Sequence, residues 1–150
     1  MANTYSQIYI QVVFAVARRE NAIRKQWRDE LFKYITGIVT NYKQKLISIG
    51  GVEDHIHILL GIKPNIALSD LIRDIKANST IFVNQKRFYK GYFNWQEGFG
   101  AFSYSHSQLG DVIAYIQNQE EHHKTSSFKN EYLTYLKRYE IDFDEKYLFE

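Results

Sequence analysis

Cysteine is absent from this 150-residue sequence, and proline occurs only once. Without cysteine, the chain cannot form a disulfide framework or a metal site built on thiolates. No apolar run reaches the roughly 20 residues that a helix needs to cross a membrane. The formal net charge of +2 is too small to argue for nucleic-acid binding by itself. These absences exclude disulfide-stabilised secreted proteins, thiolate metalloproteins and helical membrane proteins.

The composition is otherwise that of a globular protein, except for an abundance of aromatic residues. Apolar residues make up 45% of the chain and charged residues 24%, and the length favours one domain spanning residues 1–150. The first residues lack the basic segment of a secretory signal, so we expect a cytoplasmic protein. There are 12 tyrosines, 10 phenylalanines and 2 tryptophans. These rings are expected either to pack in a core or to stack on unpaired bases.

Hydrophobic periodicity predicts an alternation of strands and helices along the chain. The order β-α-β-β-α-β, followed by two helices, predicts an α+β fold with a ferredoxin-like core and an antiparallel sheet. Two main helices would cover one face, and the other face would be free for a ligand, a partner subunit or further helices. The predicted strands are 5–17, 45–50, 55–61 and 101–105, and the predicted helices are 23–42, 68–85, 107–123 and 129–139.

Local signals predict where several elements begin and end. Asn65 or Ser69 is expected to cap the helix that begins at Leu68. The pair Gly50-Gly51 is expected to interrupt the second strand. Residues 87–100 are aromatic, glycine-bearing and aperiodic, which indicates a loop, and the acidic C-terminal tail has no predicted structure.

Two histidines, His55 and His57, alternate with apolar residues on the third predicted strand. Because strand side chains alternate between faces, both imidazoles point to one side while Ile56 points to the other. Neutral imidazole is a common ligand of divalent metals. The pair therefore predicts a metal site, unless these are simply two polar residues on a solvated face. Glu53 and Asp54 precede the pair and could orient the imidazoles.

A further ligand is available from the predicted helix 107–123. Tyr115 and Gln119 are four residues apart and share one helical face, and His122 and His123 follow about one turn later. If this face meets the histidines, a phenol and an amide oxygen reach the same metal. The alternatives are a core aromatic at Tyr115, a solvated amide at Gln119, and histidines that favour the C-terminal end of a helix dipole.

Three segments together resemble a known family: DHIHILL at 54–60, WQEGFGAFS at 95–103 and YIQNQEEHH at 115–123. They are similar to the single-tyrosine HUH transposases of the smallest bacterial insertion sequences, which move as single-stranded DNA. The resemblance extends from the first predicted strand to the segment EEHHK, and the chain after about residue 128 is less diagnostic.

The resemblance implies a DNA transposase that cleaves and rejoins single-stranded DNA at insertion-sequence ends. His55, His57 and Gln119 would hold one Mg²⁺ or Mn²⁺, and Tyr115 would attack a phosphate to give a 5′-phosphotyrosine and a free 3′-OH. The DNA would be unpaired at the cleaved bond and recognised through imperfect subterminal hairpins. The family further implies an obligate homodimer in which the tyrosine helix of one subunit can complete the site of the other, in the bacterial or archaeal cytoplasm, where it acts on the nucleoid.

This mechanism agrees with elementary chemistry. A phenol has a pKa of about 10 and is a poor nucleophile at neutral pH. A metal that polarises the phosphate lowers the barrier, and rigid ligands orient the reacting groups. A covalent phosphotyrosine retains the phosphodiester bond energy, so that strands can be rejoined without ATP.

Contacts to DNA are predicted where cations and aromatic rings cluster, although each cation is equally explained as part of a solvated face. Two other functions stay open: a non-catalytic binder of single strands or hairpins, and a metal-dependent hydrolase that uses water. The candidate DNA-binding residues are Arg18, Arg19, Arg73, Lys76, Lys86, Arg87 and Lys90.

Overall fold

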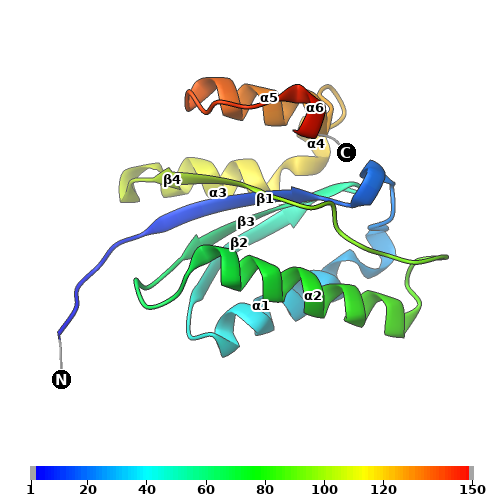
Figure 1. Ribbon diagram of the computed structural model, residues 1–150, viewed down its shortest axis with the longest axis horizontal. Helices are drawn as coiled ribbons and strands as arrows, with labels where there is room; N and C mark the ends of the chain where they lie inside the picture. Colours follow the sequence, from blue (N-terminus) through cyan, green and yellow to red (C-terminus); the bar gives the residue numbers. More distant parts are fainter. Residues whose placement is uncertain (1–2, 149–150) are drawn as a thin grey trace.

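The computed structural model describes residues 3–148, and it places a four-stranded antiparallel sheet between two layers of helices (Figure 1). The strand order is β2-β3-β1-β4, so that β3 and β1 are the central strands. The predicted α+β fold with a ferredoxin-like βαββαβ core is thereby confirmed. Among the described residues, no helix is long and apolar enough to cross a membrane. The core elements are β1 (Tyr9–Ala15), α1 (Lys25–Asn41), β2 (Lys45–Gly51), β3 (His55–Gly61), α2 (Leu68–Lys86) and β4 (Gly100–Tyr104).

The segment after β4 is more broken than the sequence predicted. One helix was expected over 107–123, but it ends at Asn118, where φ is −102° and ψ is 23°. Asparagine is a poor helix former because its side chain competes for backbone hydrogen bonds. The remaining elements are the 3₁₀ turns η1 (Ala17–Arg19) and η2 (His106–Gln108), and the helices α3 (Leu109–Gln117), α4 (Gln119–His122), α5 (Phe128–Arg138) and α6 (Glu145–Leu148).

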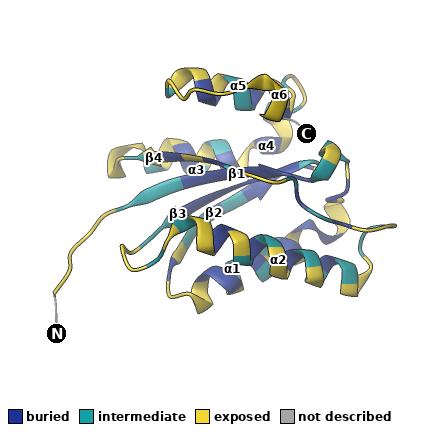
Figure 2. Ribbon diagram, in the orientation of Figure 1, coloured by how far each residue is buried: buried dark blue, intermediate teal, exposed yellow. Residues whose placement is uncertain are grey.

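Helices α1 and α2 cover one face of the sheet and enclose the main apolar core. Ile56 and Ile58 of β3 are fully buried there, beside Val12 and Phe14 of β1. Figure 2 shows the buried side of each helix turned toward the sheet. The predicted apolar stripe of α2 lies in this core, where Leu71, Ile72 and Ile75 are buried.

The second face of the sheet is covered by α3 and α5 of the same chain (Figure 1). Two glycines permit this close approach. A Cβ atom at Gly50 of β2 would lie 2.2 Å from the carbonyl oxygen of Ile116, and one at Gly100 of β4 would lie 2.7 Å from the ring of Tyr132. Of the occupants expected for this face, further helices of the same chain are the ones found, so an open face does not argue for a dimer.

Two local predictions were wrong. Gly51 does not interrupt the second strand, because it pairs with Ile56 across β2 and β3. Helix α2 has Ala67 at its N-cap with no side-chain hydrogen bond, so neither Asn65 nor Ser69 caps it. The side chain of Asn65 instead accepts a hydrogen bond from Gln44, which ties the β3–α2 loop to the residue before β2.

Candidate active site

The two histidines of β3 lie fully buried beneath the second helical layer. Each side chain is 0% exposed, so this face of the sheet is not solvated. Nδ1 of His55 is 2.8 Å from Oδ1 of Asp54, and Nδ1 of His57 is 2.8 Å from Nε2 of Gln11. These contacts hold both rings by one nitrogen and direct the other, Nε2, toward α4 and α5. Asp54 thus has the orienting contact predicted for it.

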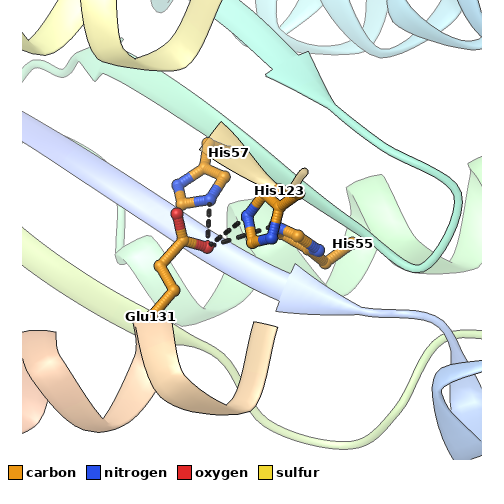
Figure 3. Close-up of side chains that lie close together, drawn as sticks. All are labelled: His55, His57, His123 and Glu131. Atoms are coloured by element: carbon orange, nitrogen blue, oxygen red, sulfur yellow. Dashed lines mark hydrogen bonds and ion pairs between the residues drawn. The ribbon is translucent and has the colours of Figure 1, made fainter. Parts of the chain in front are cut away.

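Glu131 of α5 is the centre of this pocket, and the sequence analysis missed it. Its Oε1 lies 3.0 Å from Nε2 of His57, 3.1 Å from Nε2 of His55 and 3.2 Å from Nε2 of His123 (Figure 3). The four ligand atoms all lie within 4.8 Å of one another. A signal was present, because Glu131 falls on the buried stripe of α5, between Phe128 and Tyr135, where a carboxylate requires a partner.

Helices α3 and α4 bring the predicted nucleophile and amide to the same pocket. The Tyr115 hydroxyl donates a hydrogen bond to Glu131 and lies 3.0 Å from Nε2 of His122. Oε1 of Gln119 is 3.2 Å from Nε2 of His55, and Gln119 is only 1% exposed. A single chain therefore brings together Tyr115, Gln119 and both strand histidines.

The ionisable side chains of the pocket differ in the direction of their pKa shifts. Burial disfavours a charged His55, but hydrogen bonds with Asp54 and Glu131 outweigh it and raise the pKa of His55 to about 9. Burial dominates at His57 and lowers its pKa. Burial also opposes charge on Glu131, yet hydrogen bonds from His123, His55 and His57 hold its pKa well below the usual range. Burial and the charge of Glu131 raise the pKa of Tyr115, so its side chain rests as a neutral phenol.

Arg28 of α1 connects the site to the rest of the fold. Its guanidinium is buried, lies 3.0 Å from Oε1 of Glu120, and donates to the carbonyl of Ile23 at 3.1 Å. It also lies 3.5 Å from Glu53, in the turn before β3. Glu120 and Glu53 are close in sequence to Gln119 and His55, respectively. Arg28 therefore bridges α4 and the turn before β3.

Two cavities border the site. One of about 490 Å³ is lined by residues that include Asp54, His123 and Lys25. Another of about 160 Å³ opens onto Tyr115 and Glu131. Their lining shows that His123 and Tyr115 border solvent-accessible space although the strand histidines do not.

None of the candidate DNA-binding cations lines these two cavities, and they differ in their environment. Lys86, Arg87 and Lys90 are exposed at the end of α2 and in the loop after it. Arg73 is exposed but lies 3.2 Å from both Asp70 and Asp74, and the Lys76 ammonium donates to the carbonyl of Gln96. In the turn after β1, Arg18 lies 3.3 Å from Glu20, and Arg19 adopts a left-handed backbone conformation with φ of 51°. Helix α2 covers the sheet face opposite α3, the helix that carries Tyr115 (Figure 1).

A family model described as "Transposase IS200 like" matches residues 4–119. The chain belongs to the IS200-like transposase family. The match confirms the resemblance that the three sequence segments indicated, and it ends at Gln119, before His123 and Glu131.

Two solved structures share the fold of this IS200-like transposase. A crystal structure of a candidate transposase from Deinococcus radiodurans R1 aligns with a TM-score of 0.60 at 19% identity, over 79% of this chain and 95% of that one. A REP-associated tyrosine transposase bound to a REP hairpin aligns with a TM-score of 0.58 at 13% identity, over 77% of this chain and 68% of that one. At such identities, the likeness establishes the fold. A comparison with curated proteins gave no match.

Proposed function

We propose that this IS200-like transposase cleaves and rejoins single-stranded DNA at insertion-sequence ends through a 5′-phosphotyrosine on Tyr115, in one domain spanning residues 1–150. The observation that carries the proposal is that the Tyr115 phenol shares one pocket with the paired imidazoles of His55 and His57. Family membership supports DNA strand transfer as the reaction. The tyrosine, the metal and the hairpin substrate are the parts that the experiments below test.

The donor atoms in the pocket fit a divalent cation. Nε2 of His55 and Oε1 of Gln119 are 3.2 Å apart, close to the separation of about 3 Å between neighbouring ligands of one metal. With His57, they would hold one Mg²⁺ or Mn²⁺. A bound cation would supply Lewis acidity that stabilises charge on the attacked phosphate.

The chain's own residues account for the covalent step. The Tyr115 oxygen bonds to phosphorus, the bond from phosphorus to the 3′ oxygen breaks, and the products are a 5′-phosphotyrosine and a free 3′-OH. Nε2 of His122, 3.0 Å from the Tyr115 oxygen, is placed to accept the phenol proton, and the 3′ oxygen takes up a proton as it leaves. The reverse attack by a 3′-OH rejoins the strand.

A DNA hairpin is the substrate that the comparisons favour. A structural neighbour at 13% identity is a tyrosine transposase bound to a REP hairpin. We expect the exposed cations Lys86, Arg87 and Lys90 to contact backbone phosphates, with Tyr92, which is 71% exposed, available to stack on an unpaired base. Arg18, Arg19, Arg73 and Lys76 remain candidates whose present contacts DNA would have to replace. With this substrate, the protein would act in the cytoplasm on the nucleoid.

The decisive experiment is trapping of the covalent intermediate. Single-stranded element ends that contain their hairpins are incubated with the protein and Mn²⁺, and adducts are resolved on denaturing gels. The wild type should form an adduct and Tyr115→Phe none, whereas Tyr135→Phe, which removes a neighbouring phenol, should keep it. His57→Ala should lose the adduct but bind the hairpin normally. An adduct that persists in Tyr115→Phe refutes the assignment of the nucleophile.

Mixing inactive chains tests how the sites of the predicted homodimer are shared between its subunits. Because one chain already places Tyr115 beside His57, we propose a dimer whose sites are each complete within one subunit at rest. A mixture of Tyr115→Phe and His57→Ala chains should then stay inactive. Recovered cleavage would show instead that the tyrosine helix reaches the partner's histidines.

A non-catalytic hairpin binder is the second candidate, and the full burial of His55 and His57 favours it. A binder needs neither metal nor Tyr115. Hairpin affinity unchanged by chelator, together with no cleavage of any cognate end, would establish this function instead.

A further inference from the structure

Glu131 is a buried carboxylate whose neighbours are unusual. It is 4% exposed, and the ion-pair contacts recorded for it within residues 3–148 are all with histidines: His55, His57, His122 and His123. A buried carboxylate is normally compensated by lysine, arginine or a metal. Imidazole nitrogens and a carboxylate oxygen are also common ligands of a divalent cation.

The distances around Glu131 suit four ligands of one small cation. Its Oε1 lies 3.0, 3.1 and 3.2 Å from Nε2 of His57, His55 and His123, respectively. Ligands of a tetrahedral zinc, with bonds of about 2.0–2.1 Å, are separated by about 3.3 Å. The four donor atoms lie within 4.8 Å of one another, so closure around an ion requires the widest of their separations to shorten by up to about 1.5 Å.

The outer contacts are also those of a metal centre. Asp54 accepts from Nδ1 of His55, and the backbone carbonyl of Ser126 lies 2.6 Å from Nδ1 of His123. Such contacts leave Nε2 free to ligate and keep the ring in one orientation. At His57 the atom 2.8 Å from Nδ1 is the amide nitrogen of Gln11, a donor, so ligation through Nε2 requires the carboxamide to turn its oxygen toward the ring.

We propose that His123 and Glu131 join His55 and His57 in a closed four-ligand site that takes a zinc-type transition metal in preference to Mg²⁺. Three imidazoles with one carboxylate suit Zn²⁺, whereas Mg²⁺ prefers oxygen ligands and retains its waters. This inference deepens the proposed function, on which it rests, by adding a resting form of the same pocket. With four protein ligands, the ion has no position left for a scissile phosphate, so Glu131 must leave before DNA is cleaved.

The closed form of the site depends on a ligand from the C-terminal part of the chain. The family match ends at Gln119, and Glu131 comes from α5, which follows it. Gln119 and Glu131 approach His55 from two different helices, at 3.2 and 3.1 Å. Replacement of Glu131 by Gln119, together with release of His123, would convert the closed set of ligands into the proposed catalytic set.

The test is metal affinity, measured without DNA on the untagged chain by competition with a chromophoric chelator. The wild type should bind one Zn²⁺ per chain, with Mg²⁺ weaker by about a thousand-fold or more. Glu131→Gln and His123→Ala should each weaken Zn²⁺ binding by about ten-fold or more. His106→Ala, which removes an exposed histidine in η2, is the matched control and should stay within about two-fold of the wild type.

A second readout does not depend on variants. Co²⁺ bound to the wild type should give the intense visible bands of four-coordinate geometry, and weak six-coordinate bands would overturn the proposal. Equal zinc affinity in wild type, Glu131→Gln and His123→Ala would also overturn it. If these affinities are equal but Tyr115 still forms an adduct in Mn²⁺, the inference fails and the proposed function stands. If zinc binding depends on Glu131 but the chain never cleaves DNA, the proposed function fails and only the metal site remains.

Discussion

The two faces of one sheet have opposite characters. On the face under α1 and α2, strands β1 and β3 contribute only apolar side chains, such as Phe14 and Ile58. On the face under α3 and α5, the same strands contribute Gln11, His55 and His57, all fully buried. Alternation of side chains along a strand allows β3 to serve both faces.

The difference separates side chains that stabilise the fold from side chains proposed to act in cleavage. The apolar face gains free energy from every buried side chain, at about 25 cal/mol per Å² of apolar area. The polar face buries imidazoles and a carboxylate, which is favourable only because Asp54, Gln11 and Glu131 satisfy them. A substitution on the first face should therefore reduce stability alone, whereas one on the second should affect cleavage.

Adjacent residues of β3 give the sharpest test and the largest expected effect. Ile58 faces the apolar core and Leu59 packs against Val112 and Ile116 of α3, and both are 0% exposed. Truncation of either to alanine should lower the free energy of unfolding by about 3 kcal/mol, measured by denaturant titration. Only Leu59→Ala should also slow cleavage by the folded protein, by about ten-fold, because it supports the tyrosine helix. Equal cleavage rates in the two variants would contradict the division between faces.

The next largest effect is expected at Gly50. An added methyl group would meet the backbone of Ile116, so Gly50→Ala should shift α3 and reduce adduct formation by about 100-fold. Gly110→Ala is the matched control, because no atom lies within 4 Å of a Cβ placed there. Adduct formation is measured under single-turnover conditions, and normal rates in Gly50→Ala would show that α3 need not contact the sheet so closely.

A smaller loss of stability is expected at Arg28. Arg28→Ala removes the contacts with Glu120, Glu53 and the carbonyl of Ile23, and it should cost about 2 kcal/mol. Lys25→Ala provides the comparison, because Lys25 is 78% exposed and lies 3.6 Å from Glu120. That change should stay within about 0.5 kcal/mol. Denaturant titration of both variants checks the difference, and equal costs would show that burial of Arg28 contributes nothing.

The smallest effect is expected on the surface at the end of α2. Lys86→Ala should leave stability within about 0.5 kcal/mol, weaken hairpin binding a few-fold and reduce the slope of log affinity against log salt by about 1. Arg73→Ala should change the slope less, because Asp70 and Asp74 already neutralise the guanidinium. Affinities measured across a salt series check both, and a larger change for Arg73→Ala would place the DNA along the middle of α2.

Much of the fold and part of the site could be predicted from local sequence patterns. The bounds of β3 and the start of α2 agree with the prediction, and the DHIHILL segment places His55 and His57 on one face. The helix break at Asn118 was missed, because periodicity continues through it. Glu131 was missed for a different reason, since its role depends on histidines 74 and 76 residues earlier in the chain.

By itself, the sequence determined the order of the core elements and the direction of the paired imidazoles, because these follow from the local periods of strand and helix. Only the tertiary structure decided that the second face is covered by the same chain and that His123 and Glu131 enter the pocket. Those contacts depend on how closely α3 and α5 approach the sheet over Gly50 and Gly100, which no local period specifies.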